Sequence, residues 1–513
     1  MRETIEKAIK EALGEDAPFI VERPRALSHG DYSTNAALVA KVDPQELSTK
    51  LRSLLSRNEV EKIEVVGKFI NFFLSREELI PKEQKIPQLY TGKKIMVEYT
   101  DPNPFKEFHI GHLVGNVIGE SLSRLFEATG AVVSRANYQG DVGVHVAKAI
   151  WGKTQKPELS WGEAYVYGDG EYEAHKEEID TLNKTIYEKS DTAVNKLYDE
   201  GRAESLEHFE EIYKTLGTKF VYYFFESETG PRGIEIVRKH PEVFEESEGA
   251  VVFKGEQYGL HTRVFINSKG LPTYEAKELG LAEVKQQKGS FDLSITITAN
   301  EISEYFKVVR KAAELVFPNL EGRMLARFHG FLRLTSGKMS SRKGNVITGE
   351  SLLRDLTKEA RGRQDVAVGA IKYVMLKSGM AKDIIFDPEQ SLSLEGDSGP
   401  YLQYALVRAR SLLRAAKAAG AEMGESDSPK EASVLEKVLV HYSDVVGRAA
   451  KELEPHYVTT YLTELASAFN SWYAQEKVIG GEHQDYGIFL TQAVERTLAE
   501  GLGLLGIPTP EEM

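Results

Sequence analysis

The chain has 513 residues, too many for one ordinary hydrophobic core, so we expect three or four domains. Its hydrophobic content of 41% and charged content of 28% are ordinary for a globular protein, and no apolar run is long enough to cross a membrane. The net charge of −14 disfavours nonspecific nucleic-acid binding. The absence of cysteine excludes disulfides, thiol catalysis and cysteine-ligated zinc, with the cytosol as the default compartment.

Residues 1–85 are predicted to form a small α/β domain. Helix-like segments near 3–13 and 44–57 flank short strand-like pieces such as 69–74. The charged segment 81–87 contains two prolines and indicates a domain boundary.

Residues 86–335 are predicted to form a domain around a parallel sheet. A short buried strand at 94–99, a helix from about 111 to 128 and a strand at 131–136 make a βαβ unit, the start of a doubly wound sheet. Later strands are expected at 261–266, 293–298 and 326–334.

The region 155–250 is charged and helical in pattern, and we interpret it as an insertion outside the sheet. A connecting region at 336–385 leads to residues 386–513, which are predicted to form an all-helical bundle. In this bundle Val434 to Ala449 keep helical spacing, Pro455 closes that helix, and Tyr461 belongs to the next one.

A short string at 108–112, Phe-His-Ile-Gly-His, follows the first strand and opens the helix. His109 and His112 lie one turn apart and can share a face at the helix start, where the backbone favours anions. Gly111 has no side chain and lets a base or ribose come close. A lone histidine pair is usually a surface or core feature, so this string needs support from elsewhere.

That support comes from a second string at 337–344, Gly-Lys-Met-Ser-Ser-Arg-Lys-Gly. Its Lys338 and Lys343 could neutralise departing phosphates, although the string alone could be a basic turn. Two nucleotide-handling strings occur in this order, with a βαβ unit under the first. Together they argue against a structural histidine pair at the first string and against a plain basic turn at the second. Together they resemble the HIGH and KMSKS signatures of class I aminoacyl-tRNA synthetases.

Further strings narrow the resemblance to the arginyl-tRNA synthetase family, and they span essentially the whole chain. They are found at 30–35, 97–106, 137–143, 399–405 and 502–513. The resemblance implies a class I Rossmann-like catalytic domain with a helical insertion, a small α/β N-terminal domain and an all-α anticodon-binding bundle. It also implies a cytoplasmic enzyme, expected to be a monomer and free of membranes, that joins L-arginine to tRNA(Arg) through arginyl-adenylate. ATP with Mg²⁺ is the implied co-substrate, and zinc is not expected. By resemblance, arginine is first transferred to the 2′-hydroxyl of the terminal ribose of the tRNA. The resemblance also implies that tRNA must bind before arginine is activated.

By resemblance, the catalytic side chains are Lys106, His109, His112, Lys338 and Lys343. ATP would be bound by His109, Gly111, His112, Lys338, Met339 and Ser340. Arginine would be bound by Glu98, Asp101, Asn103, His109, Tyr274 and Glu278. Carboxylates and amide oxygens suit the planar, permanently charged guanidinium of arginine. The alternative for Glu98 is a carboxylate on an edge strand, exposed to solvent and without a binding role.

Three positions depart from the family pattern. Glu278 replaces an aspartate, which lengthens the reach by one methylene, and Asp101 stands where a small hydroxyl residue is expected. Ser341 occupies the usual place of the second lysine of the second signature. How Lys106, Lys338 and Lys343 divide the work is therefore left open.

The resemblance also assigns RNA contacts in both terminal domains. They are Tyr32, Asn35, Tyr401, Tyr404, Arg408, Phe469, Tyr473 and Met513. Aromatic rings interleaved with arginine suit splayed single-stranded bases. The alternatives are a turn and helix cap at 31–35, a solvated helix face at 401–420 and core packing for Phe469.

Three rival functions fit parts of the sequence. Another class I synthetase, such as the class I lysyl type, has a similar second signature, but the Tyr-x-x-x-Glu pair, the terminal helix and the N-terminal domain argue against it. A catalytically silent tRNA-binding paralogue is disfavoured by the retained histidines and carboxylate. A nucleotidyltransferase on the same fold would rarely carry so large a helical half.

Overall fold

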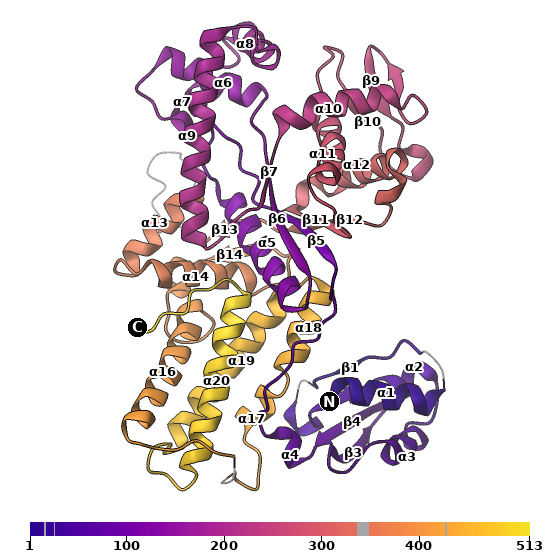
Figure 1. Ribbon diagram of the computed structural model, residues 1–513, viewed down its shortest axis with the longest axis vertical. Coiled ribbons are helices and arrows are strands. Elements are labelled where there is room, and N and C mark those ends of the chain that lie inside the picture. Colours follow the sequence, from indigo (N-terminus) through magenta and orange to yellow (C-terminus); the bar gives the residue numbers. More distant parts are fainter. Residues whose placement is uncertain (15–16, 25, 336–347, 426–427) are drawn as a thin grey trace.

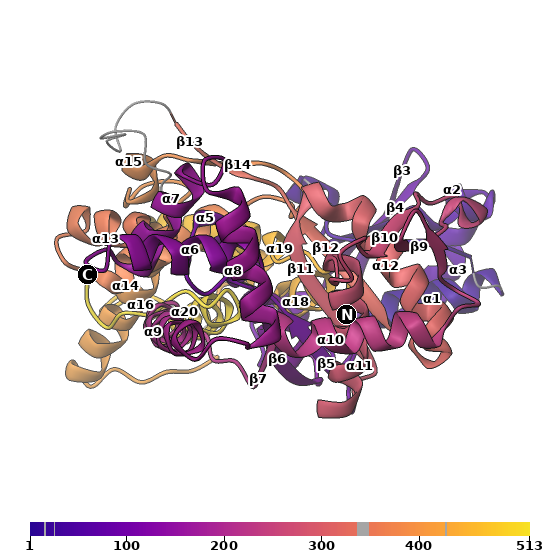
Figure 2. The same cartoon turned by 90° about the horizontal axis from the view of Figure 1, so that it is seen from above.

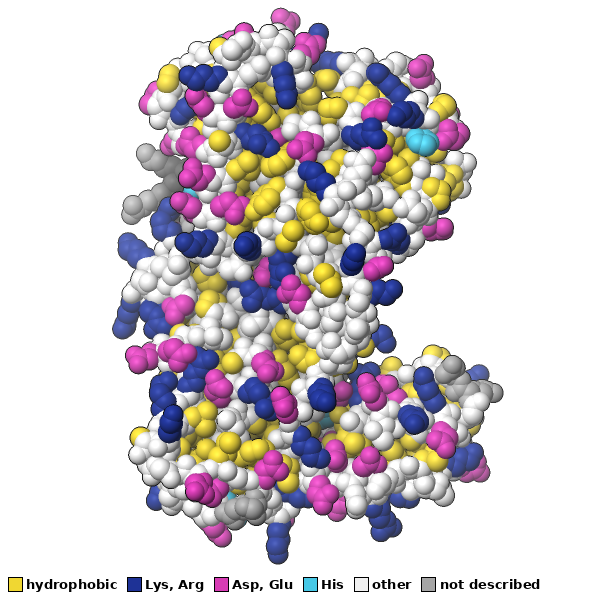
Figure 3. Space-filling model, viewed as in Figure 1, with side chains coloured by type: hydrophobic (Ala, Val, Ile, Leu, Met, Phe, Trp, Pro, Cys, Tyr) yellow, Lys and Arg dark blue, Asp and Glu magenta, His cyan; other side chains and the backbone are white. Residues whose placement is uncertain are grey.

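The computed structural model describes residues 1–14, 17–24, 26–335, 348–425 and 428–513. Figure 1 shows a sheet-containing body at the top, a helical bundle below it, and the N-terminal domain set to one side of the bundle. The space-filling view of the same face is deeply notched between the upper body and the N-terminal domain (Figure 3). Within the described residues, no helix is both long and apolar enough to span a membrane.

The N-terminal domain packs helices against an antiparallel sheet of order β1-β2-β4-β3. Its elements are α1 (Arg2–Leu13), β1 (Val21–Glu22), β2 (Tyr32–Thr34), α2 (Ala36–Ala40), α3 (Pro44–Leu54), β3 (Val60–Val66), β4 (Phe69–Leu74) and α4 (Arg76–Leu79). Asp43 caps α3 by accepting from the Gln45 amide, and Pro44 at the first helical position supplies a suitable φ. The α/β character and both helices predicted here are confirmed.

A parallel sheet of order β12-β11-β5-β6-β7 forms the centre of the upper body. Its strands are β5 (Lys94–Glu98), β6 (Val132–Gln139), β7 (Tyr222–Phe225), β11 (Leu293–Ala299) and β12 (Met324–His329). β5 lies in the middle and is a continuous buried run, as expected for a parallel strand covered on both faces. The helix α5 (Ile110–Ala128) crosses from β5 to β6, so the predicted βαβ unit is confirmed.

Two strand predictions in this region were wrong in part. The region 155–250 is not wholly outside the sheet, because the aromatic run of β7 pairs with β6 as the edge strand. The predicted strand near 261–266 exists as β10 (Arg263–Ile266), but it belongs to a separate antiparallel sheet with β8 (Glu245–Ser247) and β9 (Ala250–Phe253). Sequence pattern marks such short runs as strands but does not say which sheet they join.

Two helical lobes lie beside the carboxyl ends of the central strands. One contains α6 (Val144–Gln155), α7 (Trp161–Gly170), α8 (Lys176–Glu188) and α9 (Thr192–Leu216). The other contains α10 (Glu226–Lys239), α11 (Tyr274–Lys288) and α12 (Ser303–Val316) beside the small antiparallel sheet. Figures 1 and 2 both place the two lobes on opposite sides of the carboxyl ends of the central strands.

The C-terminal body is a helical bundle, preceded by a short connecting region. The connecting elements are β13 (Leu332–Leu334), α13 (Gly349–Glu359), α14 (Gln364–Leu376), β14 (Ile384–Phe386) and α15 (Pro388–Ser391). The bundle contains α16 (Gly399–Ala418), α17 (Val434–Leu439), α18 (Tyr442–Glu452), α19 (His456–Gln475) and α20 (Gln484–Leu504). The predicted single helix across 434–449 is two helices, since the chain turns between Leu439 and Tyr442 before Pro455 precedes α19.

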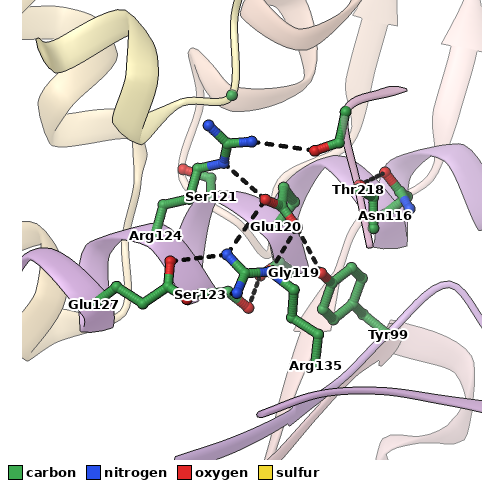
Figure 4. Close-up of polar contacts among 12 residues, drawn as sticks. Tyr99, Asn116, Gly119, Glu120, Ser121, Ser123, Arg124, Glu127, Arg135 and Thr218 are labelled. Atoms are coloured by element: carbon green, nitrogen blue, oxygen red, sulfur yellow. Dashed lines mark hydrogen bonds and ion pairs between the residues drawn. The ribbon is translucent and has the colours of Figure 1, made fainter. Parts of the chain in front are cut away.

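A buried polar network fixes the far half of α5 (Figure 4). The Glu120 carboxylate accepts from Tyr99 Oη at 2.7 Å, from Arg124 Nε at 2.7 Å and from Arg135 Nε at 2.9 Å. Arg124 also donates to the carbonyl of Gly503 at 2.9 Å, at the end of α20. Because a buried carboxylate is costly unless it is paired and hydrogen-bonded, this network locks α5 against both the sheet and the bundle.

Candidate active site

The loop between β5 and α5 carries unusual backbone geometry. Thr100, Asp101 and Phe105 all have positive φ, at 83°, 48° and 69°, although none is glycine. Asp101 is held there by the Tyr138 amide, which donates to its Oδ1 at 2.8 Å. Such conformations persist only where the surroundings enforce them, and they concentrate at functional sites.

His109 and His112 form a reciprocal cap at the start of α5. His109 Nδ1 accepts from the amides of Gly111 and His112, while His112 Nδ1 accepts from the His109 amide at 3.2 Å. The two rings stack with centroids 3.4 Å apart. Since both Nδ1 atoms accept, each neutral ring carries its proton on Nε2. Desolvation and the nearby Lys106 lower the pKa of His109 to about 4, and desolvation and His109 lower the pKa of His112 well below its usual range. Both rings are therefore neutral donors at pH 7.

The second signature string lies outside the described residues, including Lys338, Met339, Ser340 and Lys343. The chain that follows it is anchored directly on the first signature. Thr348 forms an antiparallel bridge with His109, and the Gly349 amide donates to the Phe108 carbonyl at 2.8 Å. A Cβ added at Gly349 would lie 3.0 Å from the Phe108 ring, so glycine permits this close approach.

Glu98 ends β5 as a buried carboxylate, only 1% exposed. Its Oε1 accepts from Thr296 Oγ1 at 3.0 Å, and its Oε2 lies 2.7 Å from Lys285 Nζ. This second contact is an ion pair without hydrogen-bond alignment, so among the described residues Oε2 receives no aligned donor. The position of Glu98 in the central strand excludes the alternative of an edge-strand carboxylate in solvent.

Two further carboxyl groups lie close to Glu98. Burial and the charge of Glu98 raise the pKa of Glu278 to about 8 and raise that of Asp101 well above its usual range. Glu278 and Lys285 line the same cavity of about 590 Å³ between α11, α12 and the sheet. This crowding of acids suits a ligand that brings a positive charge.

The other predicted site residues lie on the loop that follows β5 and at the start of α11. The Asn103 side chain lies over Gly140, where an added Cβ would stand 2.3 Å from its Oδ1. Lys106 Nζ sits 4.5 Å from the centre of the Tyr165 ring, and burial lowers its pKa. Tyr274 is 65% exposed at the start of α11, so its ring does not share the buried wall formed by Glu278.

Family models match the chain in three consecutive stretches. They are the arginyl tRNA synthetase N-terminal domain over residues 1–74, the class I (R) tRNA synthetase catalytic domain over 76–369, and the DALR anticodon-binding domain over 402–513. The catalytic match alone spans more than half of the sequence. The chain belongs to the arginyl-tRNA synthetase family.

Whole-chain relatives agree with this membership. An arginine–tRNA ligase of Limosilactobacillus reuteri is 29% identical over 539 aligned positions, covering 96% of this chain and 95% of the relative. One from Treponema denticola is 28% identical and covers 100% of this chain and 96% of its own length. The solved Thermus thermophilus arginyl-tRNA synthetase superposes with a TM-score of 0.83 at 26% identity, covering 100% of each chain.

In the family's anticodon-binding domain, most of the predicted RNA-contacting side chains come together on α16 and α19. Arg408 lies over the rings of Tyr404 and Tyr473, at 4.8 Å and 5.5 Å, and donates to Asn470 Oδ1. Asn470 in turn donates to Tyr401 Oη at 3.1 Å. Tyr473 is 39% exposed, and Met513 at the chain end is also exposed.

Phe469 does not join this exposed cluster. It is 0% exposed and packs beneath Tyr473, with ring centroids 6.1 Å apart. The register of Phe469 with Leu465 favoured core packing as the alternative. The structure places Phe469 in the hydrophobic core, as that alternative predicted.

Tyr32 is buried between two domains. It is 3% exposed, its Oη donates to Asp444 Oδ2 at 2.6 Å, and its ring meets His441 edge-on. A base cannot stack on this ring while the interface stays closed. Asn35 precedes α2 but makes no side-chain cap to it, because its Oδ1 accepts from the Ile20 amide at 2.9 Å. Residues Tyr32–Thr34 form strand β2, so the turn-and-cap alternative is wrong.

Sequence reasoning missed Lys285 and Asn470. Lys285 lies seven residues after Glu278, two helical turns along the same face, so the period of α11 was a usable signal. Asn470 follows Phe469 and precedes Tyr473 by three positions, but only the packing of α19 on α16 brings it to Arg408.

Proposed function

We propose that this chain charges tRNA(Arg) with L-arginine by means of the site at the carboxyl end of β5 and the start of α5, with the side chains described there. The proposal rests chiefly on the match to the family's catalytic model over residues 76–369, which contains every described residue of that site. A carboxylate oxygen of arginine attacks the α-phosphorus of ATP, and pyrophosphate leaves. The 2′-hydroxyl of the terminal adenosine then attacks the carbonyl carbon of arginyl-adenylate, and AMP leaves.

His109 and His112 act in the first step as neutral donors. Their Nε2–H groups at the start of α5, where the helix favours anions, would face the place where phosphate charge builds up, so they would stabilise it without a proton transfer. Lys106 would add a positive charge beside them. The family resemblance assigns two further positive charges to Lys338 and Lys343 of the second signature. ATP is the substrate of a class I synthetase, and Mg²⁺ would enter with its phosphates. Among the described residues, no group of three or more His, Cys, Asp or Glu side chains is arranged to hold a metal.

Glu98, Glu278 and Asp101 would recognise the guanidinium. The unsatisfied Oε2 of Glu98 is ready to accept from a planar fork of donors, and Glu278 offers a second carboxyl on another element. Asn103, whose side chain lies over Gly140, would contact the backbone end of the amino acid together with His109.

For the RNA, we propose that Tyr401, Tyr404, Arg408 and Tyr473 contact splayed anticodon bases, and that Met513 also contacts the tRNA. Stacked rings and a guanidinium plane are the groups that single-stranded bases bind. Phe469 would support this surface from beneath. Asn35 remains a proposed tRNA contact of the N-terminal domain, whereas Tyr32 would take part only after its interface opens.

The test is aminoacylation of total tRNA with labelled arginine, beside lysine and glutamine controls. Charging with arginine alone supports the proposal. Charging with lysine would favour the class I lysyl type and overturn the roles of Glu98 and Glu278. No charging with a pool that contains a cognate tRNA would favour a silent RNA-binding paralogue.

The order of binding is tested separately by pyrophosphate exchange. With enzyme, ATP and arginine alone, no arginine-dependent exchange is expected, and added tRNA should restore it. Robust exchange without tRNA would refute this order.

A further inference from the structure

Glu226 is a buried acid at the carboxyl end of β7, outside the group of acids around Glu98. It is the first residue of α10, it is 6% exposed, and its Oε2 accepts from Lys277 Nζ on α11. Burial raises the pKa of Glu226, and the charge of Lys277 opposes that rise. Among the described residues, Lys277 is the only hydrogen-bond donor to this carboxylate, so its other oxygen is available to a ligand.

Glu226 and Asn103 meet above the same glycine at the end of β6. A Cβ added at Gly140 would overlap Asn103 Oδ1 and would lie 3.4 Å from the carboxyl carbon of Glu226. The two side chains reach this point from different elements, the loop after β5 and the start of α10. Because Asn103 is proposed to contact the backbone end of arginine, Glu226 lies beside the place proposed for that end.

The other buried acid at this end of the sheet, Asp141, is occupied by the protein itself. Its Oδ1 accepts from the Ser227 amide at 2.8 Å. Its Oδ2 accepts from Ser227 Oγ at 2.7 Å, from Arg202 Nε at 2.9 Å and from Tyr198 Oη at 3.0 Å. Of these two acids, Glu226 is therefore the one that can accept from a ligand.

A carboxylate that is already paired can take a second cation. Glu120 shows this in the same molecule, because its two oxygens lie 2.7 Å from Arg124 Nε and 2.9 Å from Arg135 Nε. Lys277 contacts Oε2 of Glu226, so the pair leaves Oε1 for another positive group.

The α-ammonium of arginine carries a positive charge and three N–H donors, and burying it unpaired would be costly. We propose that Glu226 and Asn103 Oδ1 bind this α-ammonium, while Glu98 and Glu278 bind the guanidinium at the other end. A hydrogen bond to a carboxylate is roughly twice as strong as one between neutral groups, so Glu226 supplies the stronger contact. This inference rests on the proposed function and makes Glu226 a further specificity-determining residue.

Two arginine analogues test the two ends of the substrate separately. Agmatine keeps the guanidinium and the ammonium but lacks the carboxylate, whereas 5-guanidinopentanoic acid keeps the guanidinium and the carboxylate but lacks the ammonium. Their inhibition constants against arginine are measured in charging assays with the full-length enzyme, tRNA and ATP. Glu226→Gln should weaken agmatine and raise the arginine KM on the order of tenfold or more, and should leave 5-guanidinopentanoic acid at its parental value.

Two further variants separate a direct contact from other effects. Glu228→Gln removes an acid on the same helix, whose Oε2 lies 3.2 Å from Lys288 Nζ at the surface, and should change none of the three constants. The double variant Glu226→Gln/Lys277→Met also removes the uncompensated charge of Lys277, and agmatine should stay weak. If Glu226→Gln does not fold, Glu226→Asp retracts the carboxylate by one methylene and should show the same selective loss.

Parental agmatine affinity in Glu226→Gln, an equal loss for both analogues, or recovery of agmatine in the double variant would overturn the inference. A parent enzyme that does not charge arginine would instead overturn the proposed function, so the two failures are distinguishable.

Discussion

The raised pKa of Glu278 predicts that arginine recognition depends on pH. With a pKa of about 8 in the empty pocket, the carboxyl is mostly protonated at neutral pH, and arginine favours its ionised form. About a tenth of the enzyme is ionised at this site at pH 7 and about three quarters at pH 8.5, so the apparent KM for arginine should fall about eightfold over this range. The KM for arginine falls as the pH rises because only the deprotonated carboxylate of Glu278 attracts the guanidinium.

The measurement is the arginine KM in steady-state charging at saturating ATP and tRNA, at intervals between pH 7 and 8.5. Glu278→Gln is the matched control, because it has nearly the same shape and cannot ionise, so its KM should be higher and flat. His109 does not confuse the result, since its pKa of about 4 lies far below this window. A flat KM for the parent enzyme, or an equal slope for Glu278→Gln, would refute the reasoning.

Four other predictions concern separate parts of the molecule. His112→Ala removes one Nε2 donor and should slow adenylate formation about 10²–10³-fold in single-turnover assays, with tRNA affinity unchanged. Tyr473→Ala should weaken tRNA binding by about 1–3 kcal/mol in a filter-binding assay, with little loss of stability. Phe469→Ala should instead lower the free energy of unfolding by about 3–5 kcal/mol in denaturant. Tyr32→Phe removes the bond to Asp444 and should cost about 1–2 kcal/mol of stability without changing tRNA affinity; a loss of affinity alone would contradict an interface role.

The sequence was a good guide where function depends on local structure. β5, α5 and β6 are contiguous in the chain, and the strand periodicity and the histidine string locate them together. The buried carboxylate wall could be predicted only in part. Glu98 and Glu278 came from resemblance, whereas the pairing of Lys285 with Glu98 depends on α11 packing over β5.

Contacts between distant segments limit what the sequence can predict. The aromatic run of β7 is short enough to be mistaken for part of a helical insertion, and only its pairing with β6 makes it an edge strand. Tyr32 carries the family's motif, but its exposure is decided by Asp444, more than 400 residues away along the chain. Local spacing contains no information about such an interface.

The last residues of the chain complete the polar shell of the catalytic helix. Arg124 and Ser121 of α5 bond to the carbonyls of Gly503 and Leu504, and Lys372 bonds to that of Gly506. During synthesis these carbonyls have not yet been made when the catalytic domain emerges, although domains generally fold in order from the N-terminus. The α5 helix can therefore reach its final packing only after the segment 503–506 has been made and has left the ribosome. Nascent chains stalled shortly before residue 503 should leave Arg124 and Lys372 without these partners and hold the active site in an immature form.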